Sequence, residues 1–328
     1  MVEMQRISIP GATGDVFRIE FDVGWRPGHV AAYLLDFGDL VLVDAGMVSD
    51  GTVEEFDDAL SAYDYEFAAI DHLIVTHQHI DHTGMVRAIL DAGDPTMYAP
   101  ASIREKFERD YERVEAAIRT NAIRAGVGTD AFESIVDQAT ERQRVFPEKL
   151  PAQQVDQWLD HGDCVDIGSL SFEVVHTPGH QADHCVYVAT LGSERVIFSG
   201  DMANKPFRSV SAHGDLVEGV EDAIGAFYTA LDRLEKIDVD LVLPGHGPIH
   251  TEYQAIIERD RDSLDEMLET TATLVAQGAD TAYAVANERS GAVYALLIEA
   301  IGALSYLEES GELRSTIDED GCRSYEHV

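Results

Sequence analysis

The 328-residue chain contains 61 acidic and 23 basic side chains, which gives a formal net charge of −38. Hydrophobic residues make up 45% of it, enough to bury a core, so the charge does not mark an acidic disordered chain. Three cysteines do not make a disulfide framework, and no apolar run approaches the roughly 18 residues of a membrane span. Residues 1–14 lack a basic start followed by an apolar segment, so we expect a soluble, cytoplasmic protein with reduced cysteines.

The acidic residues are spread along the chain in short stretches such as 54–58, and only four of the basic residues are lysines. An evenly acidic, lysine-poor surface is typical of adaptation to high salt, where ions screen the repulsion between like charges. We therefore predict a halophilic protein whose net charge says little about its partners.

The first run of interest along the chain is the apolar segment 41–43, which ends in Asp44. A second apolar segment, 73–75, leads into four metal-binding side chains within six residues: His77, His79, Asp81 and His82. Histidine is costly to desolvate, so a solvated loop has no reason to collect three of them beside an aspartate. A strand that delivers imidazoles and a carboxylate at its end supplies ligands for a divalent metal ion.

Three later segments repeat this arrangement of an apolar, strand-like run followed by a potential ligand. The run 172–175 leads to His180, the run 195–198 leads to Asp201, and the run 241–243 leads to His246. Glycine and proline at the ends of these runs turn the backbone sharply, so each ligand can point into a shared site. One such motif would be weak evidence, but the four together predict a metal centre.

Residues 101–152, between the first metal motif and the His180 loop, are charged and carry apolar residues at helical spacing, with a break at 125–128. We predict a helical insertion near the mouth of the site. It either caps the site and shapes a substrate pocket or forms an added pair of surface helices.

Residues 251–328 are predicted to form three helices, the third from Gly291 to Glu309, followed by a hairpin over 313–325. Three helices and a hairpin make a winged helix. The third helix contains no lysine or arginine, and Arg289, Arg314 and Arg323 at its margins are a thin basic set, so nucleic acid is not an expected partner. We expect this tail to pack on residues 1–250, to close one wall of the site or to mediate a homodimer.

The order and residues of the metal motifs resemble the metallo-β-lactamase superfamily of binuclear metallohydrolases, over about the first 250 residues. The resemblance implies an α/β fold, a four-layer αβ/βα sandwich, as a catalytic domain over 1–250 that includes the insertion 101–152. The tail, 251–328, would be a second, winged-helix-like domain, as in a branch of the superfamily that includes endoribonucleases acting on single-stranded RNA.

Carried over residue by residue, the resemblance implies one metal ion bound by His77, His79 and His180 and a second bound by Asp81, His82 and His246, with Asp201 bridging both. Asp44 resembles the family's strand-end aspartate that supports the site from behind the ligands. His184 stands where glyoxalase II-like members often have a histidine, which implies either a supporting role or plain packing.

Two divalent ions sharing a water would lower its pKa from about 15.7 to near neutral and supply a metal-bridging hydroxide. Asp81 and Asp201 are the expected catalytic carboxylates, because Asp81 can orient the hydroxide and Asp201 joins the ions. Zinc suits the nitrogen-rich ligand set best, and iron or manganese also fit it.

Four functions stay open for this site. The Thr-Pro-Gly-His-x-x-x-His pattern ending at His184 resembles glyoxalase II and favours hydrolysis of a small thioester or related acyl ester. Lys205 and Arg208 could hold a carboxylate of such a small-molecule substrate, or they are solvated surface charges. The alternatives are an RNA phosphodiesterase, a mono-iron persulfide dioxygenase-like enzyme and a metal-sensing DNA-binding regulator.

Overall fold

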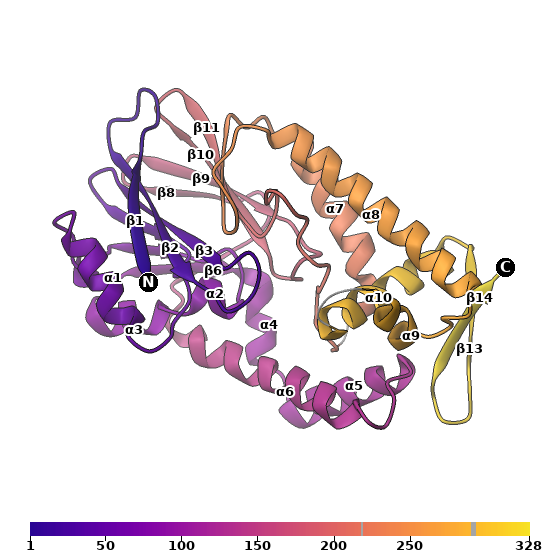
Figure 1. The fold of residues 1–328 in the computed structure, drawn as a ribbon. Helices are drawn as coiled ribbons and strands as arrows, with labels where there is room; N and C mark the ends of the chain where they lie inside the picture. Colours follow the sequence, from indigo (N-terminus) through magenta and orange to yellow (C-terminus); the bar gives the residue numbers. More distant parts are fainter. Residues whose placement is uncertain (218, 290–292) are drawn as a thin grey trace.

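Two β-sheets packed face to face form the centre of the computed structural model, which describes residues 1–217, 219–289 and 293–328 (Figure 1). The first sheet holds its seven strands in chain order: β1 (Val2–Ile7), β2 (Asp15–Asp22), β3 (His29–Asp36), β4 (Leu40–Val43), β5 (His72–Ile74), β6 (Thr96–Pro100) and β7 (Gln157–Leu159). Strands β1 to β4 pair antiparallel, and β4 to β7 pair parallel.

The second sheet has the order β12-β11-β10-β9-β8. Its strands are β8 (Cys164–Ile167), β9 (Leu170–His176), β10 (Cys185–Leu191), β11 (Glu194–Gly200) and β12 (Leu241–Pro244). Only the β11–β12 pair is parallel within this sheet. The carboxyl ends of β11 and β12 therefore lie side by side, as do those of β4 and β5 in the first sheet.

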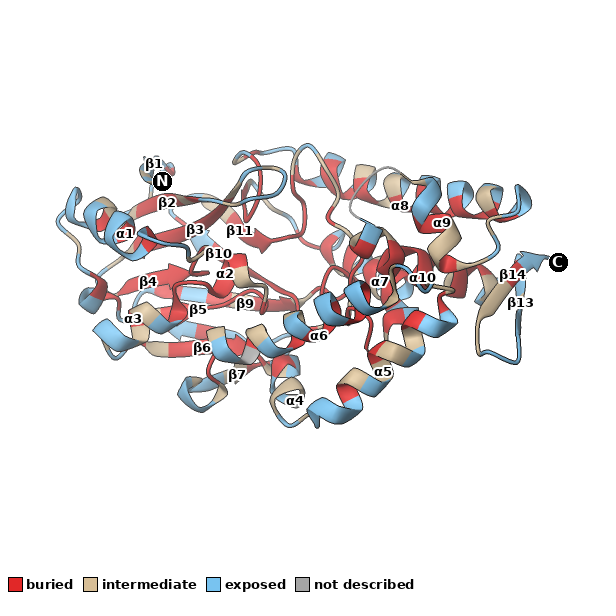
Figure 2. Cartoon of the chain, turned by 60° about the horizontal axis from the view of Figure 1, so that its bottom comes forward, coloured by how far each residue is buried: buried red, intermediate tan, exposed pale blue. Residues whose placement is uncertain are grey.

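Helices cover the outer face of each sheet, which gives the four layers. The first sheet is covered by α1 (Thr52–Ser61) and α3 (Val86–Ala92), and the second by α7 (Ala223–Leu234) and α8 (Tyr253–Ala276). The buried residues of these helices face the sheets and their exposed residues face solvent (Figure 2). Short 3-10 turns occupy Phe67–Ala69, Ala101–Ile103, Ala152–Gln154 and Val220–Asp222.

Strand β3 shows how the sequence builds these layers. Its side chains alternate between the two faces of the sheet, so Tyr33 and Leu35 enter the core between the sheets while Val30 and Leu34 pack under the outer helices. A strand buried on both faces needs an unbroken apolar run, and 30–35 is such a run. The predicted α/β four-layer sandwich is confirmed.

The insertion is helical, as predicted, and consists of α4 (Arg104–Phe107), α5 (Tyr111–Arg124) and α6 (Phe132–Lys149). The chain leaves α5 directly before the predicted break. Apolar residues of α5 and α6 share one core with α7, α8 and the C-terminal helices, for example Ile118 and Val136. The insertion therefore joins the sandwich to the tail.

The tail contains three helices and a hairpin in the expected order: α8, α9 (Ala282–Glu288), α10 (Val293–Glu309), β13 (Leu313–Ile317) and β14 (Arg323–His327). Positions 291 and 292, the first two of the predicted third helix, lie outside the described residues. Helix α10 is apolar nearly all round and packs in the same core as α7, so the tail shares its core with the sandwich. The division into domains at 250 and the winged-helix likeness stay predictions. No helix in the described ranges is long and apolar enough to cross a membrane.

Candidate metal centre

The predicted metal ligands come from strand ends of both sheets and meet at one edge of the sandwich. Strand β5 leads into His77 and His79, and the short helix α2 (Ile80–Thr83) carries Asp81 and His82. Loops after the second-sheet strands supply the others, namely His180 after β9, Asp201 after β11 and His246 after β12. Hydrogen bonds between the sheets hold this edge together, such as Ala31 N donating to Gly245 O at 2.7 Å and Cys185 N donating to Thr76 O at 2.9 Å.

Glycines directly before two of the ligands are required by close packing. Gly200 precedes Asp201 and has φ +49°, and a Cβ there would lie 2.6 Å from Nε2 of His184. A Cβ on Gly245, before His246, would lie 2.6 Å from Cε1 of His82. The Gly-ligand pattern in the sequence thus reflects both a turn and the close approach of the backbone to an imidazole.

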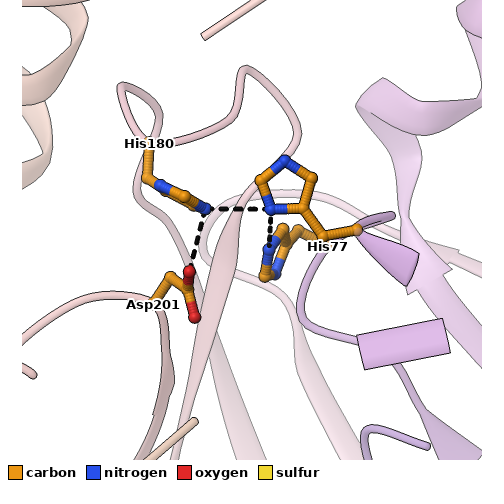
Figure 3. Close-up of side chains that lie close together, drawn as sticks. His77, His180 and Asp201 are labelled. Atoms are coloured by element: carbon orange, nitrogen blue, oxygen red, sulfur yellow. Dashed lines mark hydrogen bonds and ion pairs between the residues drawn. The ribbon is translucent and has the colours of Figure 1, made fainter. Parts of the chain in front are cut away.

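The first group of converging donors is His77, His79, His180 and Asp201, whose donor atoms all lie within 4.8 Å of one another. Nδ1 of His79 lies 3.0 Å from Nε2 of His77 and 3.1 Å from Nε2 of His180. Nε2 of His180 lies 3.0 Å from Oδ2 of Asp201 (Figure 3).

The second group, Asp81, His82 and His246, meets the same distance limit. Oδ2 of Asp81 lies 3.4 Å from Nε2 of His246. The second oxygen of Asp201, Oδ1, lies 3.0 Å from Nε2 of His82 and 3.3 Å from Nε2 of His246. Asp201 therefore presents one carboxylate oxygen to each group, which is the arrangement of a bridging ligand.

Hydrogen bonds on the outer nitrogens turn four of the imidazoles inward. Nδ1 of His82 lies 2.7 Å from Asp44 Oδ2, and Nδ1 of His77 lies 3.0 Å from Thr76 Oγ1. Backbone carbonyls take the same role for the others, at 2.9 Å from His180 Nδ1 and 2.7 Å from His246 Nδ1. With Nδ1 engaged, Nε2 of each ring is left for a metal ion, and this support also fixes the ring orientation. His79 differs, because its Nδ1 faces the group.

Asp44 lies behind the donor groups and hydrogen-bonds to the ligand loop. It lies directly after β4 with φ 60°, in the left-handed region that few residues adopt. Its Oδ1 accepts from Thr76 N at 2.7 Å and its Oδ2 from Thr76 Oγ1 at 2.9 Å, besides the contact with His82. One buried carboxylate thus holds both the start of the ligand loop and a ligand ring.

The electrostatics of the two groups differ. Burial, reinforced by neighbouring imidazoles, lowers the pKa of His77 and His79 well below the usual value, so both are neutral. Burial also opposes charge on His246, but Asp201 and Asp81 outweigh it and raise its pKa to about 10. In the same way, Asp44 and Asp201 overcome burial and raise the pKa of His82 well above its usual value.

The carboxylates stay ionised for the matching reason. Burial alone would raise the pKa of Asp201, but His246, His180 and His82 lower it well below the usual value, and His246 and His82 lower that of Asp81. The carboxylates thus favour the cationic forms of His82 and His246. A divalent ion would supply the same positive charge and displace those protons.

These side chains fit divalent metal ions. His82 Nε2 and Asp201 Oδ1 are buried and 3.0 Å apart, yet neither has a hydrogen-bond partner among the described residues. Two polar atoms that approach each other without hydrogen bonding are arranged for a common third partner. Five imidazoles and two carboxylates form a donor set that zinc, iron and manganese accept.

Comparison with known proteins agrees with this geometry. A family model described as "Metallo-beta-lactamase superfamily" matches residues 25–246, about two thirds of the chain. The chain belongs to the metallo-β-lactamase superfamily. It is therefore a metal-dependent hydrolase of this superfamily.

Relatives of similar length are found for this metallo-β-lactamase superfamily member. The probable metallo-hydrolase YqjP of Bacillus subtilis is 23% identical over 321 residues, which cover 95% of each protein. A crystal structure of a beta-lactamase domain protein from Burkholderia ambifaria matches with a TM-score of 0.76 and 22% identity, over 99% of this chain and 94% of that one. A metallo-beta-lactamase family protein from Thermus thermophilus matches with a TM-score of 0.71 and 18% identity, over 95% and 98%. At these identities the solved structures show a shared fold, which extends into the C-terminal helices.

His184 lies behind the donors of this superfamily site rather than among them. It is fully buried, and burial lowers its pKa well below the usual value, so the ring is neutral. Its Nε2 accepts from the backbone N of Asp201 at 3.0 Å, so Nδ1 carries the proton and donates to Thr177 Oγ1 at 2.7 Å. His184 therefore fixes the backbone of Asp201.

Lys205 and Arg208 are both engaged within the chain. Lys205 pairs with Glu252. Arg208 is nearly buried, pairs with Glu299 at 2.7 Å and stacks over the Phe227 ring at 5.3 Å. Their role in holding a substrate carboxylate stays a prediction, but neither cation is free in this structure.

Sequence reasoning did not identify three further contributors to the site, namely Asp183, Lys106 and Phe146. Asp183 Oδ2 accepts from the backbone N of Gln78, between two ligands, and Lys106 of α4 pairs with the buried Asp183 at 2.6 Å. Phe146 of α6 packs its ring 5.9 Å from the His79 ring. For Lys106 and Phe146 the available signal was the helical pattern of the insertion, which does not show which face of a helix meets the metal ligands. Asp183 lies in the loop between His180 and His184, where no local pattern shows that its carboxylate accepts from Gln78.

Proposed function

We propose that the protein is a binuclear hydrolase of a small thioester or related acyl ester, with zinc as its metal. The observation that carries the binuclear part is Asp201, whose two carboxylate oxygens each face one group of donors. A site for a single ion would use only one of the two donor groups.

Two divalent ions bound here would supply Lewis-acid chemistry and a water whose pKa falls to about neutral. Asp81 stays ionised in this environment, so it accepts a hydrogen bond and orients the attacking water rather than carrying a proton. Asp44 contacts Nδ1 of His82, which leaves Nε2 of that ring for a metal ion. His184 accepts a hydrogen bond from the backbone N of Asp201 and so holds that backbone in place. The buried edge limits the water that reaches these groups.

A covalent route through a cysteine has no support. Cys185 is buried, and burial raises its pKa well above the usual range, so the thiol stays protonated and unreactive. Cys164 and Cys322 belong to other parts of the fold, at the start of β8 and at the C-terminal hairpin. The proposed route is direct attack by water, which needs no cysteine nucleophile.

The thioester substrate is supported by the resemblance of the Thr177-to-His184 loop to glyoxalase II. Both histidines of that pattern contact Asp201, His180 through the carboxylate and His184 through the backbone N. RNA hydrolysis has less support, because the cations of the tail are neutralised. Arg289 pairs with Glu299, Arg314 with Glu326 and Arg323 with Glu308 and Glu221. A phosphodiester backbone would have few free cations to bind.

The test combines metal analysis with a substrate panel in molar potassium chloride. Natively purified protein should contain about two ions per chain, and thioester hydrolysis should exceed turnover of lactones, phosphodiesters and single-stranded RNA. Chelation should abolish that activity and added zinc should restore it. Faster cleavage of RNA, or one iron per chain with consumption of persulfide and oxygen, would replace this proposal with one of the alternatives.

A further inference from the structure

Arg142, on the insertion helix α6, is held rigidly beside the metal ligands. Its Nε donates to Oδ1 of Asp215 at 3.2 Å, and the neighbouring Gln143 donates to Oδ2 of the same carboxylate at 3.2 Å. Asp215 is buried and has φ 57°, in the left-handed region, so its backbone presents the carboxylate to α6 at a cost in strain.

Two aromatic rings flank the guanidinium. Cζ of Arg142 lies 5.8 Å from the centroid of Phe146, one turn further along α6, and 5.7 Å from the centroid of Tyr294, in the first turn of α10. The insertion and the tail thus fix this cation jointly. An arginine that already stacks on two rings loses less conformational entropy when it binds an anion.

This cation is connected to the metal centre through the ring of Phe146. His79 is the one member of its donor group that is not fully buried, and its ring contacts Phe146. Cζ of Arg142 lies 5.8 Å from the centroid of the same Phe146 ring, so the guanidinium and the first donor group share one neighbour.

The guanidinium keeps donors for a ligand. Its hydrogen bond to a described residue uses Nε, which leaves the two terminal amino groups, and the side chain is 37% exposed. These two groups form a planar fork that matches the two oxygens of a carboxylate.

Tyr294, whose ring flanks the guanidinium, carries a further donor in its hydroxyl. It is buried and makes no hydrogen bond of normal geometry with a described residue. Burial chiefly, and the nearby Asp215 carboxylate in part, raise the pKa of Tyr294 well above its usual value, so the hydroxyl keeps its proton. A buried hydroxyl without a full hydrogen bond is costly unless a ligand satisfies it.

We propose that Arg142 and Tyr294 form a carboxylate-binding subsite, and that the substrate is a thioester or ester whose acyl part carries a second, free carboxylate. This inference rests on the proposed hydrolase function and specifies its substrate class. In a chain with a formal charge of −38, an anionic substrate needs a local cation. Lys205 pairs with Glu252, and Arg208 uses both of its terminal amino groups within the chain. Arg142 is also paired, with Asp215, but it uses Nε for this bond and keeps its two terminal amino groups for a ligand.

The test compares matched substrates on the metal-loaded protein. The N-acetylcysteamine thioesters of succinate, glutarate and adipate are each set against the thioester in which the free carboxylate is a methyl ester. The variants are Arg142→Gln, Arg142→Lys and Tyr294→Phe, with Arg144→Gln as the control, because Arg144 is an exposed arginine on the same helix. Elemental analysis and thermal melting of each variant report metal content and folding.

We expect the wild-type protein to prefer a carboxylate thioester. Arg142→Gln should lower kcat/KM for that substrate by about 10- to 100-fold, the range of a charge-assisted hydrogen bond, and change it by less than about twofold for the methyl ester. Arg142→Lys should recover part of the loss, Tyr294→Phe should lose less than Arg142→Gln, and Arg144→Gln should change neither substrate. Equal losses for both substrates would show that Arg142 is structural and would overturn the subsite.

Calorimetric titration with glutarate and its monomethyl ester gives a second reading that does not need turnover. Tighter binding of glutarate that disappears in Arg142→Gln supports the subsite, even if no thioester is hydrolysed and the proposed function fails. Hydrolysis of both members of a pair at equal rates, with equal binding of the two acids, keeps the proposed function and removes the subsite.

Discussion

Asp201 makes two kinds of contact, one through its carboxylate and one through its backbone N. Its carboxylate joins the two donor groups, and its backbone N donates to His184. Replacing the side chain removes the shared ligand, whereas replacing His184 removes a support and leaves all the proposed ligands in place.

Asp201→Ala should therefore abolish hydrolysis and lower the bound metal, and His184→Ala should retain far more metal while turnover falls. Elemental analysis of both variants after identical purification gives the comparison, and thermal melting checks that each is folded. Equal metal loss in the two variants would show that the ligand assignment around the His180 loop is wrong.

At the scale of elements, α10 is tied to the loop after β11 by a buried carboxylate. Glu299 is 2% exposed and pairs with Arg208 at 2.7 Å and with Arg289 at 2.6 Å, and it also accepts from Ser211 N. Burial opposes ionisation, but the two guanidinium groups prevail and lower the pKa of Glu299 from 4.5 to about 2. Removing this charge would leave two largely buried cations without their partner.

Glu299→Gln should lower the free energy of unfolding by about 3–5 kcal/mol, the usual cost of breaking a buried ion pair. Urea denaturation measures it, and Glu309→Gln, at an exposed position of the same helix, should stay within about 0.5 kcal/mol of wild type. The folded-state pKa is the lower one, so the stabilisation is complete above pH 4.5 and is lost as the pH falls towards about 2. The variant should show a smaller loss of stability over that window, and an unchanged pH dependence would contradict the role given to Glu299.

The C-terminal elements lead to a prediction about nucleic acid. Helix α10 has no basic residue, and the arginines around it are paired with carboxylates. Single-stranded RNA and duplex DNA should bind weakly, with little change in affinity between low and high salt. Titrations of the whole protein across that range test this, and a steep fall in affinity with added salt would reveal several phosphate contacts.

For the whole molecule, the acidic excess predicts a dependence on salt. Sixty-one acidic residues against four lysines and nineteen arginines leave the surface repulsion unscreened in dilute buffer, where the Debye length is about 30 Å at 0.01 M. The melting temperature should rise from low to molar potassium chloride and activity should follow it. A melting temperature that stays constant over this range would remove the halophile interpretation.

The motifs along the chain predicted the strand ends from which the proposed ligands project, and the resemblance to the metallo-β-lactamase superfamily predicted the architecture. Short apolar strands followed by Gly or Pro place a side chain at a strand end, so His77, Asp201 and His246 were expected at one shared metal centre. The division of the ligands between two ions, with Asp201 as the bridge, came from the resemblance. The same local logic predicted the helical insertion and the order of the C-terminal helices and hairpin.

The surroundings of that site depend on contacts between segments that lie far apart in the sequence. Whether a charged side chain is free depends on partners far along the chain, so the pairing of Arg208 with Glu299 and the open edge of Arg142 leave no trace in local sequence. Likewise, helical periodicity shows that one face of α6 is apolar, but it does not show that Phe146 on this helix contacts His79. It also does not show that Tyr294 of α10 packs against Arg142. Local sequence specifies backbone turns and burial, whereas contacts between distant segments arise from the packing of the whole chain.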